Sequence, residues 1–204
     1  MKTTLAALLA TLLAMAAPCR TVAQDRVQES STGKSFPTQV TVAYEGKNYS
    51  LSLTGTAVRK KMVFKVYGIA HYAEDPQAGS EENVLAAMLT DGKAKQITME
   101  FVRDVDVEKI QGAYRDGFKE NLSEADAKAL APLVEQFLGY FKKEVKENDR
   151  FVLQWLPGGV VIAQTQGTTH PPVKSVAFAK ALWSIWLGED SIVDREDLVG
   201  RIVK

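Results

Sequence analysis

The sequence predicts an α+β protein in which one large antiparallel β-sheet is backed by α-helices. Short segments with alternating apolar residues come in pairs around turns, as antiparallel hairpins do. Longer amphipathic segments gather in the middle and at the end of the chain. In a parallel βαβ fold they would instead alternate with single strands.

The strands are predicted from apolar residues that alternate with polar ones. The firmest hairpin turns at Pro157-Gly158-Gly159, and another is expected around Glu45-Gly46. The predicted strands cover 40–44, 49–53, 55–74, 97–101, 151–155 and 160–165.

The helices are predicted from apolar residues repeating every three or four positions. Ser123, with Asp126 three residues later, is typical of a helix N-cap, and Gly188 suits a helix end. The predicted helices cover 81–90, 106–122, 124–143, a section that starts after Pro171-Pro172, and 194–203.

The N-terminus is predicted to be a cleaved signal peptide, residues 1–23. An apolar run over 5–17 follows Lys2 and is too short to span a bilayer, which needs about 20 residues. Small residues at Thr21 and Ala23 suit a signal peptidase. The mature chain is therefore expected in the periplasm or secreted.

Two further features complete the domain boundaries. Cys19 would also permit a lipoprotein, but Pro18 before it suits such a site poorly. Residues 24–36 are polar and are predicted to form a flexible arm. This leaves 37–204 as one domain.

The mature composition excludes several function classes. Without Lys2, Arg20 and Cys19 the chain has 23 basic residues, 25 acidic residues and no cysteine. A near-neutral chain with no basic patch argues against a nucleic-acid partner. Disulfides and thiolate chemistry are excluded, no stable membrane anchor is expected, and the hydrophobic core alone must hold the fold.

Known catalytic and cofactor motifs are absent. The sequence contains no glycine-rich nucleotide loop, no nucleophile elbow and no zinc-protease motif. His71 and His170 are a hundred residues apart, whereas a histidine-based metal site gathers three or four ligands. We therefore predict no metal and no cofactor.

The predicted strand 55–74 carries an unusual set of charges. Arg59, Lys61 and Lys65 share one face of it with Tyr67. Cations and a phenol hydroxyl along one wall suit an anionic or oxygen-rich ligand. The opposite face is predicted to be core and holds Met62, Phe64, Val66 and Tyr72.

Four segments carry a resemblance to a known family: Gly55–Arg59, Phe64–Tyr67 with Tyr72 beyond it, Tyr114–Asn121 and Leu187–Ser191. In this order and spacing they resemble the chalcone-isomerase-like family from Tyr49 to the C-terminus. The resemblance implies the chalcone isomerase fold, an open-faced β-sandwich in which a ligand cleft separates a large antiparallel sheet from its helices.

The resemblance to plant chalcone isomerases implies Arg59, Tyr114 and Asn121 as candidate catalytic residues. Three positions depart from the enzymes' pattern. Lys65 stands in place of a threonine, Gly117 in place of a lysine, and Ile185 in place of a late hydroxyl residue, unless Ser184 substitutes for it. Because ring closure needs a cation and a polarised carbonyl, these departures argue against chalcone isomerase activity.

The resemblance to non-catalytic family members that bind fatty acids implies a carboxylate clamp of Arg59 and Tyr67. The leading hypothesis is binding of a small amphipathic carboxylate, such as a fatty acid or aromatic acid, by Arg59, Lys65, Tyr67 and Tyr114. Eight residues of extended strand span about 26 Å. Arg59 and Tyr67 can therefore share a head group only if the chain bends between Lys60 and Val63.

Two alternatives stay open. The protein could be an isomerase or intramolecular lyase acting on a chalcone-like or other enone, with Arg59 as anchor, Tyr114 as proton donor and Asn121 as orienting residue. It could also be an interaction protein with a closed cleft. In that case Arg59 pairs with a buried carboxylate, Tyr114, Trp183 and Trp186 pack in the core, and Asn121 caps its helix. The sequence does not predict the oligomeric state.

Overall fold

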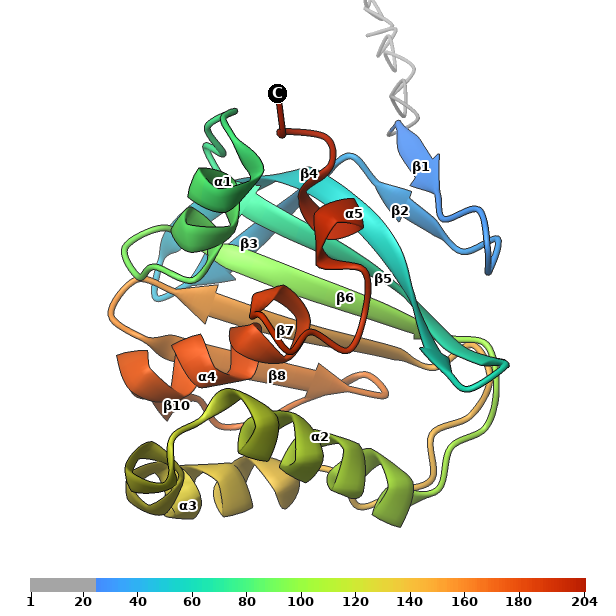
Figure 1. Cartoon of the computed structure of the whole chain (residues 1–204), viewed down its shortest axis with the longest axis vertical. Coiled ribbons are helices and arrows are strands. Elements are labelled where there is room, and N and C mark those ends of the chain that lie inside the picture. The colour runs from blue at the N-terminus through green and yellow to red at the C-terminus, as the bar shows by residue number, and fades with distance from the viewer. Residues whose placement is uncertain (1–24) are drawn as a thin grey trace, which may run out of the picture.

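One curled antiparallel sheet forms the centre of the computed structural model, which describes residues 25–204 (Figure 1). The predicted signal peptide and the lipoprotein alternative at Cys19 lie outside the described residues. The strands occur in the order β10-β8-β7-β6-β5-β4-β3, with β9 paired to β8. Their bounds are β3 Gln39–Tyr44, β4 Lys47–Lys61, β5 Phe64–Glu74, β6 Lys95–Phe101, β7 Arg150–Leu156, β8 Val160–Thr165, β9 Thr168–Thr169 and β10 Val173–Lys174.

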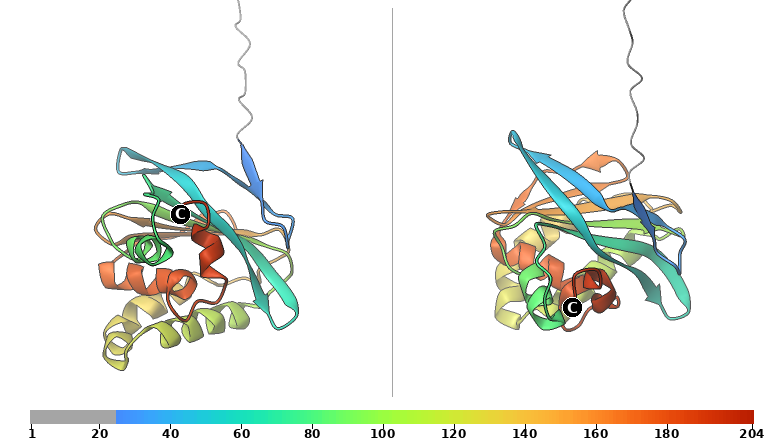
Figure 2. Two further views of the ribbon diagram at one scale, coloured as in Figure 1. Left: turned by 45° about the horizontal axis from the view of Figure 1, so that its top comes forward. Right: turned by 90° about the horizontal axis from the view of Figure 1, so that it is seen from above.

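The helices gather on one side of the sheet, as Figures 1 and 2 show. They are α1 Glu81–Met88, α2 Val107–Asn121, α3 Glu124–Leu138, α4 Val176–Leu187 and α5 Arg195–Val199. Most of helix α4 is buried, because it lies between the sheet and α2–α3. The prediction of an α+β fold, with a large antiparallel sheet backed by helices, is confirmed.

Apolar side chains form two clusters, one on each face of the sheet. The larger cluster joins the sheet to the helices and includes Trp155, Trp183 and Trp186. The smaller cluster lies on the other face and includes Phe36, Leu51 and Tyr72. The sheet is therefore buried on both faces over β4 and β5.

The segment predicted as one long strand, 55–74, is a hairpin, so this prediction was wrong. Strand β4 ends at Lys61, Met62 and Val63 form the turn, and β5 starts at Phe64. Met62 adopts a φ of 56°, which ordinarily favours glycine. With no Gly or Asn there, no residue type typical of a turn marks this position. Met62 and Phe64, predicted as core, are exposed.

The segment predicted as a flexible arm is also ordered into strands from residue 25 onward. Strands β1 (Arg26–Gln28) and β2 (Ser35–Pro37) form a hairpin, and Phe36 is fully buried. The Glu29 carboxylate closes its turn by accepting hydrogen bonds from the backbone N–H groups of Ser31 and Thr32, both at 2.7 Å. The polar composition of the segment gave no sign of this hairpin, because only a few apolar residues, chiefly Phe36 and Val27, pack it against the sheet.

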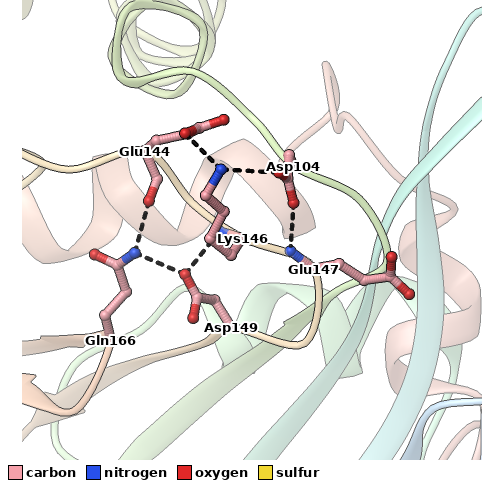
Figure 3. A network of polar contacts seen from close by, with 6 residues as sticks. All are labelled: Asp104, Glu144, Lys146, Glu147, Asp149 and Gln166. Carbon is pink, nitrogen blue, oxygen red and sulfur yellow. Dashed lines mark hydrogen bonds and ion pairs between the residues drawn. The ribbon is translucent and has the colours of Figure 1, made fainter.

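Helix α3 ends at Leu138, five residues before the predicted end, and a polar network organises the loop that follows (Figure 3). Lys146 pairs with Glu144 at 2.6 Å and with Asp104 at 2.9 Å. Asp104 also accepts a hydrogen bond from the backbone N–H of Glu147. These contacts tie the loop before β7 to the loop before α2, and so fix where α2 begins.

Candidate functional site

Arg59 and Tyr67 lie directly opposite each other on the neighbouring strands β4 and β5. Directly opposed residues of an antiparallel pair point to the same face of the sheet. The turn at Met62-Val63 supplies the bend that a shared head group requires. A register shift immediately after Arg59 adds a bulge next to the pair. Two residues eight positions apart in sequence are thus direct neighbours.

The Tyr67 side chain is buried under α4. Its hydroxyl accepts a hydrogen bond of 3.0 Å from the indole Nε1 of Trp186, and its ring packs edge-on against Phe101. Burial raises the pKa of Tyr67 to about 12, although the Trp186 hydrogen bond and the Arg59 charge both act to lower it. The hydroxyl therefore keeps its proton at neutral pH and can donate it to an acceptor.

The Arg59 guanidinium faces the loop that follows α4. It is partly buried and donates a hydrogen bond of 2.7 Å to the backbone carbonyl of Ile192. Ser191 connects the same loop to α4, because its hydroxyl donates a hydrogen bond of 2.7 Å to the carbonyl of Trp186. Within residues 25–204, Arg59 makes no ion pair with a carboxylate. The acceptor of the Arg59 guanidinium is thus a neutral backbone carbonyl, and not the buried carboxylate expected for an interaction protein with a closed cleft.

A small apolar cavity lies between the sheet and helices α2 and α4. Its free volume is about 30 Å³, enough for a water molecule. A site for a drug-sized ligand spans roughly 300–1,000 Å³. The cavity is therefore nearly closed in this conformation. Its lining residues are Tyr67, Met99, Phe101, Ile110, Ala113, Tyr114, Phe151, Ile185, Trp186 and Ile192.

Tyr114 enters this cavity from α2. Its ring stacks on Phe141 with centroids 5.0 Å apart and meets Phe137 and Trp186 edge-on. Burial, and then the proximity of Tyr67, raise the pKa of Tyr114 well above its ordinary value. Two protonated phenols thus line one apolar space.

Asn121 and Lys65 lie apart from the cavity. Asn121 is seven residues beyond Tyr114, about 10 Å along α2, and its Nδ2 donates to the carbonyl of Gly117 at 3.0 Å. The Lys65 side chain is exposed and donates to the carbonyl of Ser31, in the turn between β1 and β2. The structure therefore brings together Arg59, Tyr67 and Tyr114 but not the other two predicted site residues.

The positions that depart from the chalcone isomerase pattern have structural roles. Gly117 and Ile185 contact each other and form the crossing of α2 and α4. Ser184, the alternative hydroxyl, points away from the cavity and donates to the carbonyl of Lys180 within its own helix. The contacts of Gly117 at this crossing are with the apolar side chain of Ile185.

Trp186 packs in the core, as one interpretation of the sequence expected, and its indole N–H donates to the Tyr67 hydroxyl, an acceptor that the sequence did not identify. Sequence reasoning missed one other participant. Ile192 contributes a backbone carbonyl, and no side chain signals such a role. The one sequence feature that could have indicated this role is the Leu187–Ser191 segment, which carries part of the family resemblance and directly precedes Ile192.

Comparisons with known proteins agree with this fold. A family model described as chalcone isomerase-like matches residues 28–197. A crystal structure of a fatty-acid binding protein from Arabidopsis thaliana superposes with a TM-score of 0.70 at 18% identity, covering 86% of this chain and 96% of that chain. No curated protein sequence matches significantly. No helix within residues 25–204 is long and apolar enough to cross a membrane.

Proposed function

The chain belongs to the chalcone isomerase-like family, and we propose that it is an exported, non-catalytic protein that binds a small amphipathic carboxylate, such as a fatty acid. The observation that carries this proposal is the Arg59–Tyr67 pair: Tyr67 lines the apolar cavity, and Arg59 binds the backbone of Ile192, which lines it too. The fatty-acid binding protein that shares the fold supports the ligand class.

The head group is proposed to bind between Arg59 and Tyr67. A carboxylate would replace the Ile192 carbonyl as the acceptor for the Arg59 guanidinium, and the protonated Tyr67 hydroxyl would donate to the second oxygen. Charge-assisted hydrogen bonds of this kind contribute about 1.5–3 kcal/mol each. Trp186 would hold the Tyr67 hydroxyl in place by donating to it.

The tail is proposed to occupy an enlarged form of the cavity. Admission of an acyl chain would require the loop 188–194 to move away from β4, because its Ile192 both binds Arg59 and lines the cavity. Ser191 and the Ile192 N–H bind carbonyls of α4, so exchanging the Ile192 carbonyl for a carboxylate would release a contact of the loop with β4 while leaving these contacts in place. Loop rearrangements on binding occur in a substantial minority of complexes.

Calorimetric titration of the delipidated protein with dodecanoate tests the proposal. Saturable binding is expected, with at least ten-fold weaker affinity for the uncharged analogue dodecanol. Arg59→Ala should weaken dodecanoate binding by about ten-fold or more, since it removes a charged hydrogen bond. Arg115→Ala is the matched control, because Arg115 pairs with Glu135 on the exposed outer surface. Absence of binding, or equal effects of the two variants, would contradict the proposal and favour an interaction protein with a closed cleft.

The alternative of an enone isomerase is tested on the same preparation. We expect a panel of chalcones to cyclise no faster with the protein than spontaneously, because Gly117 and Ile185 replace polar groups of the enzymes. Acceleration that disappears in Tyr114→Phe would establish catalysis instead.

Export is proposed from the sequence of residues 1–23. Mass spectrometry of the protein recovered from the periplasm or medium of its host should find a new N-terminus near residue 24. A full-length chain retained inside the cell would contradict export.

A further inference from the structure

The turn between β4 and β5 exposes three consecutive apolar side chains. Met62 is 88% exposed, Val63 84% and Phe64 56%. Within residues 25–204 the only other large hydrophobic residue so exposed is Val176. A run of exposed apolar residues opposes solubility unless it serves a function.

Cations surround these apolar residues. Lys60, Lys61 and Lys65 are exposed on the two strands, and the Arg103 guanidinium lies 4.7 Å from the centre of the Phe64 ring. No acidic residue occurs anywhere between Gly46 and Ala73. The hairpin end is therefore strongly basic in a chain whose overall charge is near zero.

Two local features of this turn oppose folding. Lys60 and Lys65 lie directly opposite each other, and like charges in that relation destabilise a strand pair. Met62 holds a positive φ at a turn position where glycine is preferred. Neither feature improves the packing of the protein itself. The opposed lysines are explained if the tip binds an anionic external surface, and the exposed apolar side chains are explained if that surface is also apolar.

We propose that this tip, residues 60–65, docks the protein reversibly on a membrane surface containing anionic phospholipids. Met62, Val63 and Phe64 would enter the boundary between head groups and acyl chains, while Lys60 and Lys61 would contact the phosphates. This mode of attachment needs no membrane-spanning segment.

The shape of the tip favours a membrane over a folded protein partner. The β4–β5 hairpin ends in a two-residue turn at the periphery of the molecule (Figure 2). A stable protein interface buries roughly 800 Å² on each partner, which a narrow convex turn does not supply. A bilayer accepts a few apolar side chains without matching their shape.

The acidic residues of the loops before α2 and before β7 are already compensated within those loops. Asp104 and Glu144 pair with Lys146, and Asp149 accepts hydrogen bonds from Gln166 and from the backbone N–H of Lys146 (Figure 3). Glu29, Asp194 and Asp197 line a surface hollow together with Lys60 and offset part of its charge, whereas Lys61 and Arg103 do not line that hollow.

The inference goes beyond the proposed ligand site but is compatible with it. Arg59 directly precedes the tip in β4, and Tyr67 follows it two residues after Lys65. Docking by the tip would hold the Arg59–Tyr67 pair close to the bilayer, where amphipathic carboxylates partition. The membrane contact itself does not require that the cavity binds them.

Co-sedimentation with vesicles tests the proposal, using residues 24–204 and phosphatidylcholine vesicles with or without phosphatidylglycerol. We expect binding only with phosphatidylglycerol, weakened by added salt. The double variant Met62→Ser/Phe64→Ser should reduce partitioning about ten-fold or more. Lys60→Gln/Lys61→Gln should reduce it roughly five-fold per lysine.

Matched controls separate the tip from general surface effects. Val176→Ser removes an exposed apolar side chain elsewhere, and Lys142→Gln/Lys143→Gln removes two exposed charges elsewhere. Both should bind vesicles like the parent protein. Absence of vesicle binding, or equal losses in tip and control variants, would overturn the proposal. Dodecanoate affinity measured without vesicles reports separately on the ligand site.

Discussion

Gly117 of α2 lies against Ile185 of α4 so closely that a Cβ on the glycine would come within 3.0 Å of Ile185 Cγ2. These positions correspond to a lysine and a hydroxyl residue in the plant enzymes that the chain resembles. Here they form an apolar helix crossing. The crossing lets α4 approach α2 and narrows the cavity that Tyr114 and Ile185 line.

A double-mutant cycle tests this contact. Gly117→Ala alone gains helix propensity, up to about 1 kcal/mol, but must displace Ile185. In the Ile185→Ala background the overlap is gone, so the same change should be more stabilising by about 1 kcal/mol in urea unfolding. Gly112→Ala is the control, because a Cβ at Gly112 meets nothing within 4 Å. Strictly additive effects of Gly117→Ala and Ile185→Ala would disprove the contact.

Two buried tyrosines on β5 should respond in opposite ways to loss of the hydroxyl. Tyr67→Phe leaves the Trp186 N–H without its acceptor and should destabilise the fold by about 1–2 kcal/mol. The Tyr72 hydroxyl is buried with no hydrogen-bond partner among the described residues. Tyr72→Phe should therefore be neutral or stabilising. Chemical denaturation measures the free energy of unfolding of both variants. A larger decrease for Tyr72→Phe than for Tyr67→Phe would contradict the assigned hydrogen bonding of the two hydroxyls.

His71 should remain neutral far below its ordinary pKa. The indole of Trp183 donates to Nε2 at 3.3 Å, so Nδ1 carries the proton and donates to Thr54 Oγ1 at 2.7 Å. Burial, and secondarily the charge of Lys95, lower the pKa of His71 to about 3. NMR titration of the two imidazoles should show His170 titrating somewhat below pH 6.5 and His71 unchanged down to pH 4.

The same shift predicts how stability depends on pH. The unfolded chain takes up a proton at His71 near pH 6.5, while the folded chain resists until about pH 3. The free energy of unfolding should therefore decrease as the pH falls through this window. An imidazole at position 71 that titrates near 6.5 would contradict the buried arrangement.

The fold followed from the sequence where periodicity and turn chemistry agreed. The hairpin at Pro157-Gly158-Gly159 and the Ser123 cap of α3 are examples, since Ser123 Oγ accepts from the Asp126 N–H. The β4–β5 turn could not be predicted, because Met62 occupies a turn position with positive φ, where glycine is the usual residue. The β1–β2 hairpin could not be predicted either, because its order depends on Phe36 and Val27 packing on the sheet and on the Glu29 hydrogen bonds within its turn.

The candidate site was predictable only in part. Arg59, Tyr67 and Tyr114 came from residue chemistry and from the family resemblance. Their proximity depended on the unrecognised turn. The Trp186–Tyr67 hydrogen bond and the Ile192 carbonyl depend on how α4 and its following loop pack, which a local pattern does not encode.

The central claim is that Arg59 and Tyr67 hold the head group of a carboxylate beside Trp186. Its most direct test is a ¹⁵N-resolved NMR titration of the three tryptophan indoles with dodecanoate. The Trp186 N–H should shift, because its acceptor is the Tyr67 hydroxyl, whereas Trp155, which donates to Asp91, should not. An unchanged Trp186 resonance at saturating dodecanoate, or the same Trp186 shift in Arg59→Ala at equal ligand concentration, would contradict the account.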